Sequence, residues 1–192
     1  MKTLVFDIET ANFFTDPDVG WNNFARLRIS GVGIYEYEAD RYSYFEENEL
    51  AAAAEHFRNA ETLVGFSMNR YDIPVLNYHF ERLKAGINLF EKERVDLLDK
   101  IEFVTGRRIS LSRLAEANLG EIKKGHGSQA IKMYDERRFE ELKEYCLKDV
   151  ELTKRLYDIY LERGMFYIPD KETGEMKEIY FAKQNSADTN SS

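Results

Sequence analysis

The run Thr3-Leu-Val-Phe-Asp-Ile-Glu-Thr10 constrains the fold of this chain more than any other feature, because it predicts a buried strand that carries two carboxylates. Side chains alternate between the two faces of a strand, so Val5, Asp7 and Glu9 share one face. Two like charges on so apolar a strand repel each other and are costly to desolvate. A bound divalent cation removes both costs. The alternative is a strand that ends at a solvated sheet edge.

A long helix, predicted over about residues 138–162, carries a further carboxylate on its apolar side. Apolar residues recur there every three or four positions, and Asp149 falls within the stripe that they form. Tyr145 precedes it by one turn, so the phenol and the carboxylate face the same small volume. A carboxylate on a buried face must be neutralised, hydrogen-bonded or metal-bound. The alternative is an Asp at the margin of the stripe that pairs with Lys148 or Lys154.

The segment from Gly65 to Leu76 joins a predicted strand to a predicted helix. Asp72 lies at the entrance of that helix, and Pro74 occupies the first turn, where its missing N–H costs nothing. Asp72 is therefore either a helix N-cap or a further member of the carboxylate group. An N-cap explains the local sequence by itself, but it does not explain the other carboxylates in awkward positions.

In chain order, these features are Asp-x-Glu on an N-terminal strand, an Asp at a strand-to-helix junction and Tyr-x-x-x-Asp on a late helix. This order resembles the DEDD superfamily of 3′-to-5′ exonucleases, in the tyrosine-bearing subclass that includes the proofreading domains of family-B DNA polymerases. The resemblance spans residues 1 to about 164 and rests on Phe6-Asp-Ile-Glu-Thr10 and Tyr145-Cys-Leu-Lys-Asp149. It implies an RNase H-like fold and hydrolysis of phosphodiesters at single-stranded 3′ ends.

The middle motif departs from the family pattern, in which two or three residues usually separate an Asn from the aromatic residue that precedes the Asp. Ser67 occupies one of these places, and Asn69 is separated from Tyr71 by Arg70 alone. Asn69 is retained as a candidate contact to a substrate phosphate or base. The assignment of Asp72 is unaffected, because the Tyr-Asp pair itself is intact.

The cofactors that the resemblance implies are two divalent cations, Mg²⁺ or Mn²⁺. Carboxylates and water suit such hard cations, and the chain has no Cys/His cluster typical of zinc sites. Two metals roughly 4 Å apart can clamp the attacking and leaving oxygens of a phosphodiester. By resemblance, Asp7 bridges both ions, Glu9 and Asp149 bind the ion that activates the nucleophile, and Asp72 reaches the other through water. Tyr145 would orient the attacking water, since a phenol with an ordinary pKa near 10 suits orientation better than proton abstraction.

Residues beside the first motif are candidate substrate contacts. Thr10 and Phe13 follow Glu9 closely, and an aromatic ring there can stack on a terminal base, a contact worth about 1–3 kcal/mol per base. Phe14 is a second candidate for the same contact. The alternative is core packing, which we favour for most aromatics of this connection: Phe13, Phe14, Trp21 and Phe24.

Basic residues gather in a glycine-interrupted loop over residues 120–128, and Arg107 and Arg108 form a smaller group. Glycines permit close backbone approach to a phosphate. An ordinary flexible connection between helices is the alternative. Three side chains of the loop are candidate substrate contacts: Lys123, Lys124 and His126.

Composition limits the class of protein. With 192 residues and 43% hydrophobic content, the chain can bury one substantial core. Cys146, the single cysteine, falls on the apolar stripe of the long helix and predicts a core residue without a disulfide. No run approaches the ~18 apolar residues of a membrane span, so we expect a cytoplasmic protein. The net charge of −8 argues against extensive duplex binding, but it allows a strand end to be held at a cleft.

We expect an α/β fold with three layers and a central mixed sheet of five strands, because strands and helices interleave along the chain. The first three strands should form an antiparallel meander. Asp96 follows the fifth strand and is either a helix N-cap or a support for the cleft. The strands are predicted near residues 2–9, 28–37, 40–46, 62–66 and 93–96. The helices are predicted near residues 48–58, 73–85, 97–105, 110–117, 128–135 and 138–162.

The nuclease-like domain is expected over residues 1–164, followed by a hairpin over 165–182 and a polar tail over 183–192. Three functions compete on this evidence: a metal-dependent 3′-to-5′ exonuclease, a catalytically silent nucleic-acid-binding module, and an interaction domain. The first implies a single-stranded DNA or RNA 3′ end as partner, and a polymerase or helicase in trans as a further one. The sequence does not distinguish DNA from RNA.

Overall fold

The central sheet has five strands, in the order β3-β2-β1-β4-β5. β1 pairs antiparallel with β2, and β2 pairs antiparallel with β3, whereas β1–β4 and β4–β5 are parallel. The computed structural model describes residues 2–20, 23–121 and 128–181. The predicted five-stranded mixed sheet and its antiparallel meander are therefore confirmed. The strands are β1 (Thr3–Thr10), β2 (Ile29–Glu36), β3 (Arg41–Glu46), β4 (Thr62–Gly65) and β5 (Glu93–Asp96).

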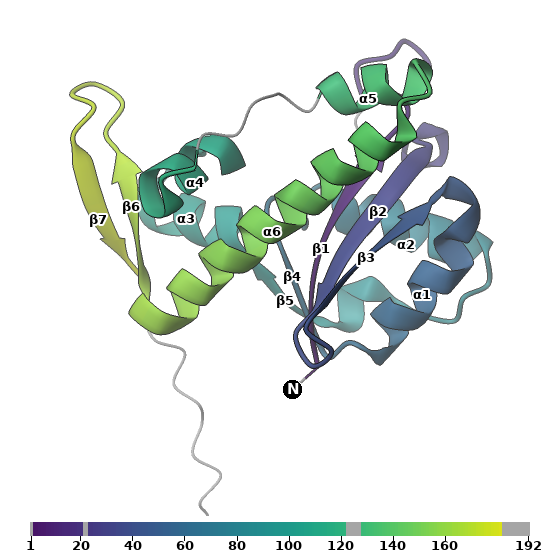
Figure 1. Cartoon of the computed structure of the whole chain (residues 1–192), viewed down its shortest axis with the longest axis horizontal. Helices are drawn as coiled ribbons and strands as arrows, with labels where there is room; N and C mark the ends of the chain where they lie inside the picture. The colour runs from purple at the N-terminus through teal and green to yellow at the C-terminus, as the bar shows by residue number, and fades with distance from the viewer. Residues whose placement is uncertain (1, 21–22, 122–127, 182–192) are drawn as a thin grey trace, which may run out of the picture.

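Six α-helices surround the sheet within the described residues, all close to their predicted positions (Figure 1). Short 3-10 turns over residues 24–26 and 89–91 have no counterpart in the prediction, and a third, over 47–49, overlaps the start of the helix predicted near 48–58. The helices are α1 (Leu50–Asn59), α2 (Asp72–Arg82), α3 (Leu97–Thr105), α4 (Leu111–Leu119), α5 (Ser128–Asp135) and α6 (Phe139–Arg163).

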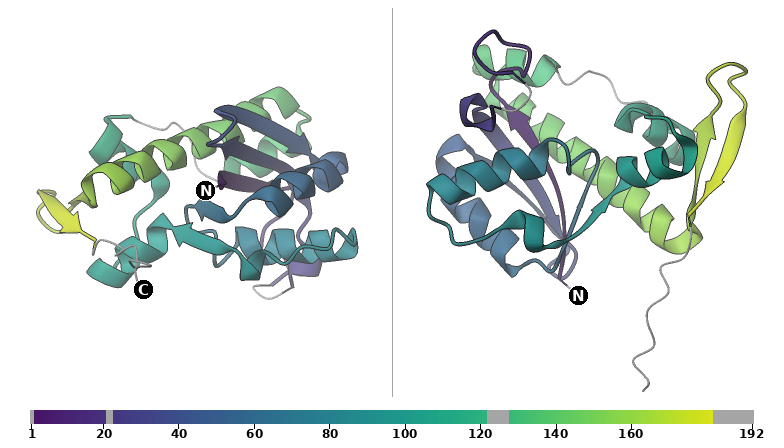
Figure 2. Two further views of the ribbon diagram at one scale, coloured as in Figure 1. Left: turned by 90° about the horizontal axis from the view of Figure 1, so that it is seen from below. Right: turned by 180° about the vertical axis from the view of Figure 1, so that it is seen from behind.

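Alternation along β1 divides the interior into two hydrophobic clusters, one on each face of the sheet. Phe6 is directed to the face covered by α1 and α2, where its ring meets Phe57 at a centroid distance of 5.0 Å. Val5 is directed to the opposite face and belongs to the cluster that includes Val150 and Leu156 of α6. Figure 2 shows the sheet between these helical layers. The side chains that share the face of Val5 therefore point toward α6.

A two-stranded hairpin, β6 (Met165–Pro169) and β7 (Met176–Tyr180), follows α6 and packs beside α4. Phe166 of β6 is fully buried and belongs to the same hydrophobic cluster as Val5. Asn118 of α4 fixes the hairpin, because its side chain donates to the carbonyl of Tyr167 and accepts from the same residue's N–H, both at 2.8 Å. The predicted hairpin is thus present at the expected residues, while the predicted domain boundaries stay a prediction. The tail over 183–192 lies outside the described residues.

None of the helices in the described part of the chain is both long enough and apolar enough to cross a bilayer.

Candidate active site

Asp7 and Glu9 lie in the second half of β1, on the face that α6 covers. One ligand atom each from Asp7, Glu9 and Cys146 of α6 lie within 4.8 Å of one another. The Cys146 sulfur is 3.7 Å from the carbonyl oxygen of Asp7 and 3.9 Å from its Oδ2. Glu9 is only 8% exposed. Asp7 is half-buried, so two carboxylates are held close together on one face of the strand, as the alternation along it predicts.

The pKa of the Cys146 thiol reflects its burial and the carboxylates around it. The thiol is fully buried, and burial raises its pKa well above the ordinary value. The carboxylates of Asp7, Glu9 and Asp149 raise that pKa further, in this order. Cys146 therefore remains a neutral thiol within reach of three negative charges. The sequence correctly places it in the core, but its contact with Asp7 was not predicted.

Glycine on β2 permits the close packing of α6 over these acids. Asp7 is paired with Gly33 across the sheet. A Cβ at Gly33 would lie 2.9 Å from the Cys146 sulfur, a distance that real Cβ atoms essentially never show. It would also lie 3.0 Å from Cγ2 of Val150, which is tighter than most real Cβ contacts. Any larger residue would therefore push α6 away from the strand that carries Asp7. Gly33 was not predicted as part of the site, although glycines at alternate positions of a strand are a signal of such close packing.

Tyr44 of β3 is a second residue that the sequence analysis missed. Glu9 is paired with Gly31, and the Tyr44 hydroxyl occupies the space where a Cβ of that glycine would stand. Burial raises the pKa of Tyr44, and Cys146 and Glu9 add to this effect. The Tyr44 hydroxyl therefore keeps its proton beside Glu9.

Asp149 and Tyr145 lie one turn apart on α6. Asp149 is 8% exposed and Tyr145 is half-buried. Asp149 thus belongs to the buried stripe and not to its margin. The lysines that a marginal Asp would pair with, Lys148 and Lys154, form ion pairs of 2.8–2.9 Å with other carboxylates. These carboxylates are Glu121, Glu151 and Asp158.

Asp72 is the first residue of α2, and the N-cap position belongs to Tyr71. The alternative that Asp72 is the N-cap is therefore wrong. Asp72 is 5% exposed, and burial raises its pKa well above the ordinary value, with a further contribution from the nearby Asp96. A carboxyl in this position is costly to ionise unless a cation lies close to it.

Tyr71 connects the middle motif to the first motif. Its hydroxyl is 2.8 Å from Oγ1 of Thr10, at the end of β1. Burial raises the pKa of Tyr71 although the Thr10 hydrogen bond lowers it, and the charges of Asp72, Glu9 and Asp7 raise it further. Tyr71 therefore joins the end of β1 to the start of α2, the two elements that carry Glu9 and Asp72.

Asp96 holds the loop between β4 and α2. Its carboxylate, 2% exposed, accepts the backbone N–H groups of Ser67 and Asn69 at 2.9 Å. It also caps α3 by accepting the N–H groups of Leu98 at 3.0 Å and Asp99 at 3.2 Å. The predicted N-cap role of Asp96 is therefore confirmed, and its support of a cleft stays a prediction. One carboxylate fixes the start of α3 and the approach to Asp72 together.

Replacing Asp96 by Ala is expected to lower the free energy of unfolding by about 3 kcal/mol, since it removes a cap and leaves buried N–H groups without an acceptor. Urea unfolding followed by circular dichroism measures the loss. Ser110→Ala is the matched control, because Ser110 caps α4 through one hydrogen bond, to the N–H of Arg113. It should cost only about 1 kcal/mol. Equal losses in the two variants would show that Asp96 acts as an ordinary cap.

The predicted substrate contacts remain predictions. The Thr10 hydroxyl donates to the Asn12 carbonyl at 3.0 Å in addition to its contact with Tyr71. The Asn69 amide donates to Oδ2 of Asp99 at 2.8 Å, and Phe13 is 40% exposed. The other predicted contacts, together with Trp21, lie outside the described residues: Lys123, Lys124 and His126.

Comparisons with known proteins agree with this architecture. A protein-family model described as RNase_H superfamily matches residues 4–161. Among solved structures, the chain is similar to the family B DNA polymerase from the hyperthermophilic archaeon Pyrobaculum calidifontis, with a TM-score of 0.67 and 20% sequence identity. That alignment covers 84% of this chain and 24% of that chain, so the likeness concerns the fold alone. Comparison with curated proteins gives no match. Because the family model matches most of its length, the chain belongs to the RNase H superfamily.

Proposed function

We propose that this protein is a metal-dependent 3′-to-5′ exonuclease of the tyrosine-bearing DEDD subclass, which shortens single-stranded nucleic acid. Membership of the RNase H superfamily supports a nuclease in general. The observation that carries the finer proposal is the closeness of Asp7 and Glu9 beneath α6, the helix that also presents Tyr145 and Asp149. The resemblance of the sequence motifs supplies the direction of cleavage.

The donor set fits hard divalent cations. Glu9, Asp72 and Asp149 are each at most 8% exposed, and Asp7 lies beside Glu9. Buried carboxylates of like charge need positive charge close by, and oxygen donors suit Mg²⁺ or Mn²⁺. In the proposal, these four residues hold two such ions. When bound, the ions stabilise the negative charge that develops on the phosphodiester.

The protein's own groups have separate tasks in this proposal. Tyr145 donates or accepts a hydrogen bond to orient the attacking water. Tyr71 fixes the end of β1 against the start of α2, so that Asp72 keeps its position relative to Glu9. Asp96 stabilises the loop that leads to Asp72. Such fixed geometry matters because small displacements of reacting groups reduce catalysis strongly.

Incubation with a single-stranded oligonucleotide labelled at its 5′ end tests the proposal. In Mn²⁺ or Mg²⁺, we expect a ladder of products that shortens one nucleotide at a time, which gel electrophoresis resolves. A strand labelled at its 3′ end should release labelled mononucleotide first. DNA and RNA strands are compared in parallel. No shortening of either labelled strand under any divalent cation would contradict the proposed activity.

Thermal unfolding separates the other two functions. Stabilisation by Mn²⁺ without cleavage would indicate a binding module that has lost catalysis. Neither stabilisation nor cleavage would indicate an interaction domain. A polymerase or helicase acting in trans remains part of the proposal, in keeping with the similar polymerase, which carries this fold within 24% of its chain.

A further inference from the structure

A basic pocket lies beside the C-terminal hairpin, away from the carboxylates. It is formed by the end of α3, the connection to α4, the first turn of α4, and the end of β6 with the turn that follows it; these elements lie together at one end of the molecule (Figure 1). Its volume is about 210 Å³. We call it the hairpin pocket, and its lining residues are Ile101, Thr105, Arg107, Arg108, Ile109, Ser110, Arg113, Ile168, Pro169 and Lys171.

The charge of the hairpin pocket is opposite to that of the protein. Four of its lining residues are cationic, namely Arg107, Arg108, Arg113 and Lys171, and none is acidic. The chain as a whole has a net charge of −8. Among these four, only Arg108 forms an ion pair within the described residues, with Glu102 at 3.3 Å. Four cations around one small pocket repel each other, and a bound anion would relieve that repulsion.

The size of the pocket selects the kind of anion. Sites for drug-sized ligands usually measure about 300–1,000 Å³, which is larger than this pocket. A compact group such as a phosphate fits better, and arginine side chains present several N–H donors to phosphate oxygens. Thr105 and Ser110 also line the pocket, although their hydroxyls already bond to backbone groups of Ile101 and Arg113. We propose that the hairpin pocket binds a phosphate group.

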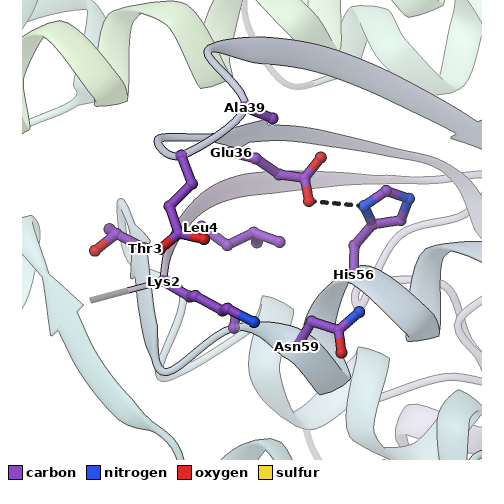
Figure 3. A pocket seen from close by; sticks show the side chains of 9 residues that line it. Lys2, Thr3, Leu4, Glu36, Ala39, His56 and Asn59 are labelled. Carbon is purple, nitrogen blue, oxygen red and sulfur yellow. Dashed lines mark hydrogen bonds and ion pairs between the residues drawn. The ribbon is translucent and has the colours of Figure 1, made fainter.

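Another pocket is chemically unsuited to this role. Figure 3 shows a pocket at the opposite end of β1, where Glu36 accepts a hydrogen bond from His56 at 3.0 Å. Glu38 also lines it, beside Lys2. Two carboxylates around this pocket disfavour an anion. Of these two pockets, only the hairpin pocket has no acidic side chain in its lining.

Arg108 connects the hairpin pocket to the candidate active site. Its Nη2 donates to the Ser67 hydroxyl at 2.9 Å, in the loop that Asp96 fixes ahead of Asp72. β1, β4 and β5 are parallel, so their carboxyl ends share one edge of the sheet. The nine residues of α3, about 13 Å long at 1.5 Å per residue, separate this edge from the pocket. This step rests on the proposed function: the phosphate belongs to the backbone of the substrate strand, upstream of its 3′ end.

The double variant Arg113→Gln/Lys171→Gln tests the inference without touching Arg108 or the carboxylates. Binding of a fluorescent 12-mer and a dinucleotide is measured by anisotropy in EDTA at several salt concentrations. Each lost phosphate contact lowers the salt slope of log K by about 0.7 for a single strand, so the 12-mer, which loses one contact, should lose about 0.7. The dinucleotide, too short to span α3, should bind the variant and the wild type alike.

Arg41→Gln/Arg82→Gln is the matched control, because it removes two exposed cations from β3 and α2. An equal change of slope in both double variants would overturn the inference, since it would show a general effect of charge. So would an unchanged slope in Arg113→Gln/Lys171→Gln while the wild type still shortens the strand. Inorganic phosphate that stabilises only the wild type, with no change in 12-mer binding, would assign the pocket to a free anion and overturn its role with the strand. A wild type that binds the 12-mer through the pocket but never cleaves would instead contradict the proposed activity.

Discussion

The Asp149→Asn variant is expected to shorten a labelled oligonucleotide more than about 100-fold more slowly than the wild type, since removing even a partner of a metal ligand typically costs 10–100-fold. The substitution keeps the shape of the side chain and removes its charge. Asp149 is 8% exposed and contributes to the field around Cys146, so the change acts inside the candidate site. Initial rates in Mn²⁺, measured on the same strand, give the ratio.

The fold of Asp149→Asn should survive, because removing a buried charge lowers a desolvation cost. Its melting temperature without metal should therefore be close to that of the wild type, while the stabilisation by Mn²⁺ should be smaller. Glu144→Gln removes the same charge from an exposed position of the same helix and should leave the rate unchanged. If Asp149→Asn cleaved at the rate of this control, Asp149 would have no place in the catalytic site.

Gly33→Ala is expected to lower the free energy of unfolding by about 1–3 kcal/mol, the usual cost of overpacking a well-packed core. The added Cβ would lie 2.9 Å from the Cys146 sulfur and 3.0 Å from Val150, so α6 must move away from β2. Because α6 carries Asp149 and Tyr145, we also expect the rate of strand shortening to fall. Urea unfolding measures the first effect and initial rates in Mn²⁺ measure the second.

Two further variants test whether the loss of stability in Gly33→Ala comes from the steric clash with α6. Gly33→Ala combined with Cys146→Ala removes the sulfur that the new methyl group would meet, so it should recover part of the lost stability. Gly31→Ala places its Cβ against the end of the Tyr44 side chain, which can move at less cost than a helix. It should therefore destabilise less. A Gly31→Ala variant as unstable as Gly33→Ala would show that loss of glycine from β2, and not the approach of α6, sets the cost.

Local pattern was sufficient to predict the elements of the fold. Strand alternation placed Asp7 and Glu9 on one face, and helical periodicity placed Asp149 within a buried stripe, because both patterns depend only on neighbouring residues. Helix ends were less secure. The sequence allowed Asp72 to be the N-cap of its helix, yet in the structure Asp72 is the first residue of α2 and Tyr71 is the N-cap. Capping depends on backbone angles that a short sequence does not determine.

Contacts between distant segments could not be predicted in this way. The sequence offers no reason for Gly33 to face Cys146, for Asp96 to accept N–H groups from the loop before α2, or for Arg108 to reach Ser67. Each contact joins residues that are far apart along the chain. Their partners are selected by how the layers pack, and periodicity does not record packing between layers.

The covering of β1 by α6 has a consequence for synthesis of the protein on the ribosome. The strand that carries Asp7 and Glu9 is synthesised well before the helix that encloses them, because β1 covers Thr3–Thr10 and α6 begins at Phe139. Long-range contacts of this kind form slowly and late. A nascent chain therefore holds its paired acids open to water until α6, which begins 130 residues after Glu9, has been synthesised.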